Sequence, residues 1–292
     1  MTADIPNFSK LRVAISVSES ADLQRLGFSE AHLRLVLGEI ARTVLVHGGS
    51  LIYGGHLLPT GYTTFLVREL ERYRHPDRPL QICLPWSEHA TLDFEALEKR
   101  KRAYGLYALV TCLDIHGVEV QRVNGQALQN ELSHEERVQS LSAMRRFVAN
   151  SCDCRILIGG KLRDYQGAIP GVIEEAVLAL RSSTPLLLAG GFGGATAEIL
   201  RAIDPHFVEW FPPSAERRWE PTLPDQNALA EIQKLWRRNE GQYFKYLGKE
   251  QMQTLAATHR PSEVATLVGQ ALTKMGRSVS KKIKIKKATR KP

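Results

Sequence analysis

Two glycine-rich turns, each placed directly after a short apolar segment, constrain this sequence more than any other feature. The first turn, residues 54–61, follows the apolar run 51–53, and the second, residues 159–171, follows the apolar run 155–158. A strand, a turn whose glycines bring bare backbone close to a ligand, and a helix N-terminus together make the usual anion site of α/β proteins. The sequence therefore predicts two phosphate-binding turns in one sheet, with a nucleotide between them.

Apolar runs alternate with amphipathic segments along most of the chain. The predicted strands are residues 11–17, 51–53, 80–84, 107–114, 155–158 and 185–189, and the predicted helices are residues 31–46, 63–73, 95–102, 134–150, 171–181 and 196–203. Because the strand segments are near-continuous apolar runs and do not alternate between apolar and polar residues, they favour an α/β fold with a mostly parallel sheet and helices on both faces. Two further helical segments, residues 227–239 and 262–275, predict a helical C-terminal extension packed on the same domain.

The positive charge is concentrated at the C-terminus. The chain has 39 Lys and Arg against 31 Asp and Glu, and eight of the 39, with no acidic residue, lie in residues 277–292. The remaining 31 basic residues balance the 31 acidic ones, so the body is neutral and offers no broad basic face for nucleic acid. We interpret residues 277–292 as a disordered basic tail; weak, salt-sensitive contact with nucleic acid or an anionic surface is the alternative.

Other features of the sequence indicate a cytoplasmic protein. Residues 1–6 lack the basic start of a secretion signal, and no apolar run approaches the ~20 residues of a membrane span. Four cysteines lie in or beside strand segments without metal-ligand spacing, which favours buried reduced thiols. They are Cys83, Cys112, Cys152 and Cys154. The histidines are scattered, so we expect neither a metal nor a cofactor.

Polar residues at the predicted strand ends are candidates for ligand contacts. Ser16, Ser18 and Glu19 end the first strand, at the edge where ligands of open α/β sheets bind; a turn leading into a helix is the alternative. A further glycine run, Gly190–Gly194, follows the sixth strand and is interpreted as a packing turn; a contribution to the site is the alternative. The residues that begin the helix after the first turn, where free N–H groups favour an anion, are Gly61, Tyr62 and Thr63.

The order and spacing of these motifs resemble the SLOG superfamily. This Rossmann-like group includes LOG-type phosphoribohydrolases, DNA-processing proteins of the DprA type, and nucleotide-sensing domains of channels and bacterial defence proteins. LOG-type members carry a Y-G-G-G-x-x-G turn, an R-K pair on a helix, and a P-G-G-x-G-T-x-x-E motif. The matching segments here are Tyr53-Gly54-Gly55 with Gly61, Arg145-Arg146, Ile158-Gly159-Gly160, and Gly171–Glu175. The resemblance covers residues 11–203.

The resemblance implies roles for particular residues. In LOG-type enzymes the arginine and the last glutamate act on the N-glycosidic bond of a nucleoside monophosphate. By resemblance, Arg145 would hold phosphate or ribose oxygens, and Glu175 would engage the ribose hydroxyls and stabilise an oxocarbenium-like transition state. Glu174 is either a ligand contact or a solvated residue of the first helical turn. The remaining binding candidates in the two turns are Gly54, Gly55, His56, Gly159, Gly160, Lys161 and Gly171.

The sequence departs from the LOG pattern in both turns. His56 stands in place of the third glycine, residues 57–60 lengthen the first turn, residues 161–170 are inserted into the second, and Val172 replaces a threonine. We expect these changes to enlarge the pocket and to fit the sensor-like branches, whose ligands resemble ADP-ribose or other NAD-derived nucleotides. The residues of the insertion that either contact this ligand or form an exposed polar loop are Lys161, Arg163 and Tyr165.

Two classes of function remain open from the sequence. In the first, residues 1–205 form a nucleotide-binding domain of a sensor or regulator, followed by the helical extension, residues 206–276, and the tail. In the second, the domain is a hydrolase that releases a base from a nucleotide. A DNA-binding role of the DprA type is weaker, because the body is neutral. The resemblance also implies a homodimer formed through helices beside the site.

Overall fold

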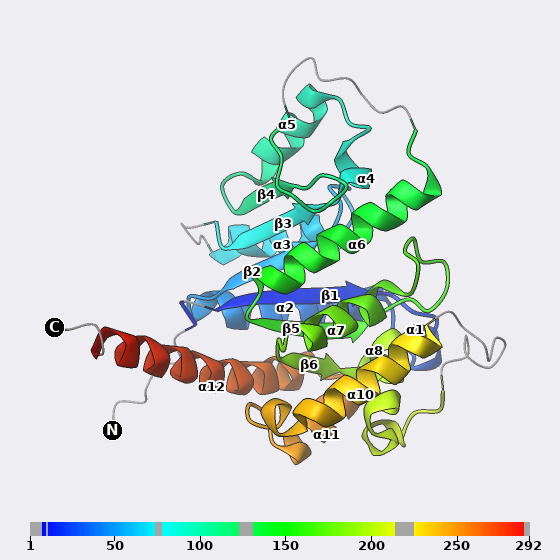
Figure 1. The fold of residues 1–292 in the computed structure, drawn as a ribbon, viewed down its shortest axis with the longest axis vertical. Coiled ribbons are helices and arrows are strands. Elements are labelled where there is room, and N and C mark those ends of the chain that lie inside the picture. Colours follow the sequence, from blue (N-terminus) through cyan, green and yellow to red (C-terminus); the bar gives the residue numbers. More distant parts are fainter. Residues whose placement is uncertain (1–7, 10, 74–77, 123–130, 214–224, 289–292) are drawn as a thin grey trace.

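The chain forms one parallel sheet between two layers of helices (Figure 1). The computed structural model describes residues 8–288, except 10, 74–77, 123–130 and 214–224. Within these residues, six strands pair in the order β4-β3-β2-β1-β5-β6, and every pairing is parallel. The strands are β1 (Arg12–Ser18), β2 (Ser50–Gly54), β3 (Leu80–Leu84), β4 (Ala108–Cys112), β5 (Cys154–Gly159) and β6 (Leu186–Ala189).

Helices cover both faces of this sheet. In Figure 1, α6 and α7 lie in front of the strands, and α2 and α3 lie behind them. The helices up to residue 203 are α1 (Asp22–Arg25), α2 (Glu30–Val46), α3 (Tyr62–Tyr73), α4 (Trp86–His89), α5 (Phe94–Tyr104), α6 (His134–Ser151), α7 (Gly171–Arg181) and α8 (Gly194–Ile203), with the short 3-10 helix η1 (Gly190–Phe192) before α8. The architecture confirms the predicted α/β class and the parallel sheet with helices on both faces.

Local sequence explains where the long helices begin and end. Ser29 and His32 form a capping box at the start of α2, and Ser133 and Glu136 form another at the start of α6. Gly48 follows α2 with a φ of 78°, a left-handed conformation that ends a helix at little cost for glycine. The interior faces of both helices pack on apolar strand residues, which places the core on both sides of the sheet.

The C-terminal part is helical, as predicted. After η2 (Pro205–Val208), it consists of α10 (Gln226–Tyr243), α11 (Lys249–Ala257) and α12 (Pro261–Ala288). α10 packs on α7 and α8, α11 on β6, and α12 on α2. The expected start of the tail at residue 277 falls inside α12, which continues to Ala288; residues 289–292 lie outside the described residues.

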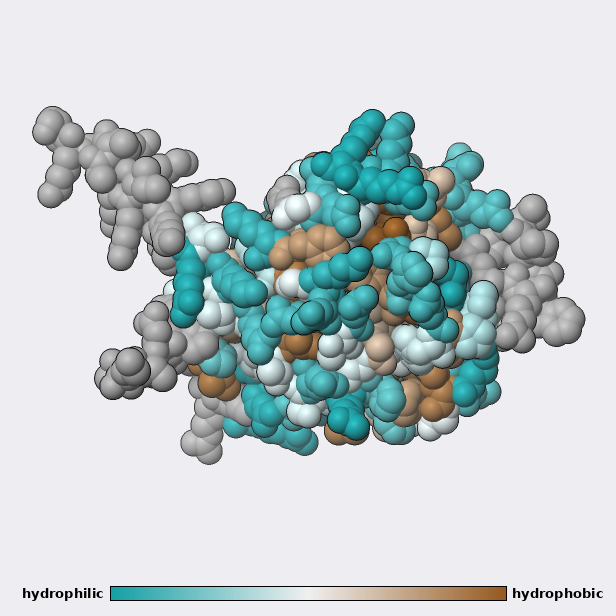
Figure 2. Space-filling model, turned by 90° about the horizontal axis from the view of Figure 1, so that it is seen from below, coloured by the Kyte–Doolittle hydropathy of each residue, from teal (hydrophilic) through white to brown (hydrophobic). Residues whose placement is uncertain are grey.

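The surface on the side of α10, α11 and α12 is mainly hydrophilic. Figure 2 shows polar side chains over most of this end of the molecule, with small hydrophobic areas between them. Among the residues that the structure describes, none of the helices combines the length and the apolar character needed to cross a membrane. All four cysteines are buried and unpaired, as the sequence predicts.

Strand order fixes where a ligand can enter. The chain runs outward from β1 to β4 and then returns to place β5 on the other side of β1. Helices that follow β1 and β5 therefore leave the sheet on opposite sides, which opens a crevice at the carboxyl ends of these two strands. Both glycine-rich turns follow strands that end at this same edge, β2 and β5.

Candidate functional site

A pocket of about 220 Å³ lies at this edge of the sheet. β1, β2, β5, α4, α6 and α7, or the loops that follow these strands, each contribute to its wall. The predicted site residues that line it are Ser16, Ser18, Gly54, Gly55, His56, Arg145, Lys161, Gly171 and Glu175. The predicted site residues that do not line it are Glu19, Gly61, Tyr62, Thr63, Gly159, Gly160 and Glu174. The two turns therefore converge, but not through all of their glycines.

Glu175 reaches the pocket from the first turn of α7. Its Oε1 lies 3.1 Å from Nη1 of Arg155, a β5 residue whose side chain is only 1% exposed. The same Nη1 donates to Oγ of Ser16 at 2.9 Å. Tyr53 lies close enough that burial, and then the Glu175 charge, raise the pKa of its hydroxyl. Glu175 is therefore a partly exposed carboxylate with a buried countercharge behind it.

Arg145, on α6, pairs with Glu174, the neighbour of Glu175 on α7. Both side chains are largely buried, with 11% and 16% of their surfaces exposed. The guanidinium packs closely against the end of the inserted loop, since a Cβ at Gly167 would stand 2.7 Å from Nη1 and a Cβ at Gly171 would stand 2.5 Å from Nη2. Arg145 therefore binds one end of the insertion to α6, while it still lines the pocket.

The second turn uses part of its backbone internally. Gly159 and Gly160 adopt φ values of 62° and 106°, which suit glycine. The amide of Gly160 donates to the carbonyl of Ser18 at 2.8 Å, and the amide of Lys161 donates to Oγ of Ser18 at 3.2 Å. The amides available for an anion are therefore those at the N-terminus of α7, where Gly171 and Val172 line the pocket.

Only the first residues of the first turn line the pocket. Gly54, Gly55 and His56 line the pocket, and the His56 ring packs against Gly61. Tyr62 turns away toward α2, where its ring lies under the guanidinium of Arg34. Burial, followed by the charges of Glu19 and Glu30, raises the pKa of Tyr62. The first residues of α3 therefore do not line the pocket, although the Thr63 side chain lies close to Gly55.

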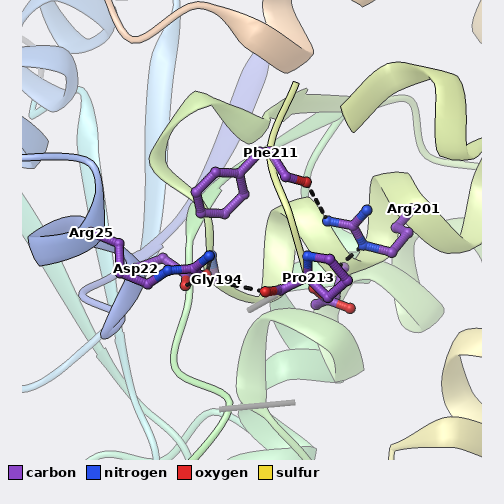
Figure 3. Close-up of polar contacts among 7 residues, drawn as sticks. Asp22, Arg25, Gly194, Arg201, Phe211 and Pro213 are labelled. Atoms are coloured by element: carbon purple, nitrogen blue, oxygen red, sulfur yellow. Dashed lines mark hydrogen bonds and ion pairs between the residues drawn. The ribbon is translucent and has the colours of Figure 1, made fainter. Parts of the chain in front are cut away.

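The third glycine turn is closed by a carboxylate from within the chain. Figure 3 shows Asp22 between Arg25 and Gly194, beside the segment that carries Phe211. The fully buried Asp22 accepts from the Gly194 amide at 2.8 Å and from Nη1 of Arg25 at 2.7 Å. This carboxylate takes the place that a ligand anion would occupy at the N-terminus of α8. The Gly190–Gly194 run is a packing turn, as interpreted from the sequence.

Sequence reasoning missed several residues of the pocket wall. Glu88 of α4 follows β3 at the same edge, and burial raises its pKa, while the His56 charge opposes this shift. Its position directly after a predicted strand was a usable signal. Arg155 carried a second signal, as a lone charge inside an apolar strand. The other lining residues that were not selected as site residues are Ile15, Val17, Tyr53, Pro85, Leu141, Met144, Gln166 and Val172.

The insertion does not give the large pocket expected from the sequence. Tyr165 and Gln166 form part of the wall, Leu162 is buried in the core, and Arg163 does not line the pocket. The volume of about 220 Å³ lies below the ~300–1,000 Å³ of typical small-molecule pockets. The loop is held down by its contact with Arg145, so a dinucleotide-sized ligand requires the loop to move.

The fold and this pocket define a Rossmann-like α/β domain with a pocket at its topological switch point. The profile of the family described as SLOG cluster2 matches residues 7–259, so the chain belongs to this family. Membership indicates a nucleotide-binding or nucleotide-processing domain. The matched range continues past residue 205 and includes α10 and α11. No curated protein matches the chain.

Proposed function

We propose that the pocket binds a nucleotide-type ligand, a nucleoside phosphate or an NAD-derived nucleotide such as ADP-ribose, and that the protein acts as a sensor or regulator. The observation that carries this proposal is that one pocket combines a helix N-terminus and two cationic side chains with a carboxylate. A phosphate requires the helix N-terminus and the cationic side chains. A ribose suits the carboxylate, which can accept hydrogen bonds from its hydroxyls. The role in nucleotide signalling or defence rests on the resemblance to sensor-like SLOG branches.

The phosphate end of the pocket is formed around the start of α7. Gly171 and Val172 present backbone at this helix N-terminus, where the macrodipole favours an anion. Lys161 is exposed and lines the same wall, so its ammonium can reach a phosphate from solvent. Arg145 offers a planar fork that suits phosphate oxygens, once it exchanges Glu174 for the ligand.

The ribose end is formed by hydroxyl and carboxylate groups. Ser16 and Glu175 both line the pocket and both contact Nη1 of Arg155, which donates a hydrogen bond to Oγ of Ser16 and forms an ion pair with Oε1 of Glu175. A carboxylate oxygen accepts hydrogen bonds from sugar hydroxyls, and a serine hydroxyl can donate to them. The ring of Tyr165 supplies an aromatic surface for a base at the rim.

The ion pair between Arg145 and Glu174 favours a sensor over an enzyme. Arg145 is paired with Glu174 and contacts Gly167 of the inserted loop and Gly171 at the start of α7. A phosphate that takes Arg145 from Glu174 would release this contact, so binding and loop position would be linked. A pocket in which ligand binding changes the position of a loop can signal that the ligand is bound. An enzyme does not need this link between binding and loop position to turn over its substrate.

Ligand binding without turnover tests the proposal. The purified chain is incubated with AMP, NAD or ADP-ribose while thermal stability and base release are followed. We expect at least one nucleotide to raise the melting temperature, and we expect Glu175→Ala to abolish this increase. Glu231→Ala is the matched control, because Glu231 is a carboxylate of α10 in a surface pair with Arg181. Absence of stabilisation by all three nucleotides would contradict the proposal.

The alternative function is a LOG-type N-glycosidase. It is favoured by one observation, that Arg145 and Glu175 line the same pocket, as the resemblance to phosphoribohydrolases requires. A carboxylate beside the anomeric carbon would stabilise the positive charge of the transition state. Release of free base from AMP, lost in Glu175→Ala and kept in Glu231→Ala, would establish this enzyme in place of the sensor.

A further inference from the structure

Arg155 is the most completely buried arginine among the described residues. It lies on β5, between β1 and β6, is 1% exposed, and does not line the cavity. Its strand is otherwise apolar, with buried residues on both sides. A charge at such a position is costly unless it is well paired, and an apolar replacement of similar volume often stabilises a protein. Fold stability therefore gives a weak reason for this arginine.

Among the described residues, the side-chain contacts of Arg155 are one hydrogen bond and one ion pair, both to pocket residues. Nη1 donates to Oγ of Ser16 at 2.9 Å and lies 3.1 Å from Oε1 of Glu175. Nε and Nη2 are buried and have no hydrogen-bonding partner among the described residues. A guanidinium placed for stability would be expected to satisfy more of its five N–H groups. This one is placed so that a single nitrogen serves two residues of the site.

These bonds determine what Ser16 and Glu175 offer to a ligand. Because Nη1 donates to Oγ of Ser16, that oxygen is an acceptor toward the sheet and its own O–H can donate into the pocket. Because the guanidinium lies against Oε1 of Glu175, Oε2 is the oxygen that can accept from a ligand. The pocket therefore presents a donor beside an acceptor, a pattern that matches two neighbouring hydroxyls of a sugar.

We propose that Arg155 is a positioning residue, which orients Ser16 and Glu175 from behind so that together they bind the vicinal hydroxyls of a ribose. This inference rests on the proposed function, because it names the part of the nucleotide that these two residues recognise. It assigns to Arg155 no contact with the ligand. Its effect passes through Glu175, and that dependence can be measured.

A double-mutant cycle measures how far the effect of Arg155 on ligand affinity depends on Glu175. Affinities for ADP-ribose and AMP are determined by calorimetry for the unaltered chain, Arg155→Met, Glu175→Gln and the double variant. We expect Arg155→Met to weaken binding about tenfold or more, as for the loss of hydrogen bonds to a charged group. In the Glu175→Gln background the same change should weaken binding by less than about threefold.

Two further variants separate positioning from folding. Arg155→Lys keeps the charge and is expected to recover most of the affinity that Arg155→Met loses. Arg201→Met is the matched control, because Arg201 of α8 is a partly buried arginine that bonds to the carbonyl of Phe211 and does not line the pocket. It is expected to lower the melting temperature and leave both affinities unchanged. If Arg155→Met does not fold, the comparison of Arg155→Lys with the double variant, which removes both charges, decides the question.

The outcomes distinguish the inference from the proposed function. If the unaltered chain binds neither ADP-ribose nor AMP, the proposed function fails and the inference fails with it. If the chain binds, but Arg155→Met binds equally well or loses the same factor with and without Glu175, the inference alone is wrong. A 2′,3′-dideoxy analogue of AMP should also bind the unaltered chain less tightly than AMP does. It should bind Glu175→Gln as tightly as AMP does.

Discussion

Replacing Glu174 with glutamine tests whether a ligand must displace an internal ion pair. Glu174 holds Arg145 in a contact that leaves only 11% of the arginine and 16% of the glutamate exposed. In the proposed complex, Arg145 exchanges this carboxylate for a phosphate. The ligand therefore binds only as tightly as the difference between the two interactions allows.

The size of the effect follows from the change in charge. A hydrogen bond to a charged partner stabilises a protein by about 1.5–3 kcal/mol, and one between neutral groups stabilises it by about 0.5–1.5 kcal/mol. Glu174→Gln therefore lowers the cost of releasing Arg145 by about 1 kcal/mol, which corresponds to about fivefold tighter binding. This gain in affinity applies only to phosphorylated ligands, because adenosine has no phosphate that could bind Arg145.

Isothermal calorimetry with AMP, ADP-ribose and adenosine checks this expectation. Glu231→Gln is the control, since it removes the charge of a carboxylate that pairs with Arg181 on the surface, outside the pocket. We expect tighter binding of AMP and ADP-ribose to Glu174→Gln alone. Weaker or unchanged binding of both nucleotides would refute the exchange, and equal improvement for adenosine would show that the gain does not come from Arg145.

Two other predictions concern the described fold. Asp22→Ala removes the buried carboxylate that accepts hydrogen bonds from the Gly194 amide and from Arg25 (Figure 3). We therefore expect the free energy of unfolding to fall by about 3 kcal/mol. Asp22→Asn should lose less, because it keeps an acceptor for the amide. A melting temperature within about 2 °C of the unaltered chain would contradict this account. Burial lowers the pKa of His89 from 6.5 to about 4, so the neutral ring contributes stability that is complete above pH 6.5 and lost as the pH falls toward 4. Urea denaturation at pH 7 and pH 4.5 should show a smaller loss in His89→Gln than in the unaltered chain; equal losses would assign the effect to other groups.

The sequence was sufficient for the fold because most of its elements carry local signals. β3 and α7 have the predicted bounds, and the other predicted strands agree with the structure to within two residues. Their apolar runs and flanking glycines are properties of neighbouring residues. The short helices α1 and α4 were missed because each consists of four residues, too few for a periodic pattern.

The site was harder to predict because side-chain direction depends on packing between distant segments. The sequence placed Gly61, Tyr62 and Thr63 at a helix start, but did not indicate that this start lies outside the pocket wall. Nor did it indicate that Ser18 occupies the amides of Gly160 and Lys161. The pairing of Arg145 with Glu174 joins two helices that meet only in the folded chain.

A crystal structure of the chain with AMP or ADP-ribose would test the central claim most directly. The account predicts a phosphate at the N-terminus of α7, with an oxygen within about 3.2 Å of the amide nitrogen of Gly171 or Val172, and a ribose hydroxyl against Glu175. Nucleotide bound elsewhere on the chain, with the Arg145–Glu174 pair intact and this pocket empty, would contradict it.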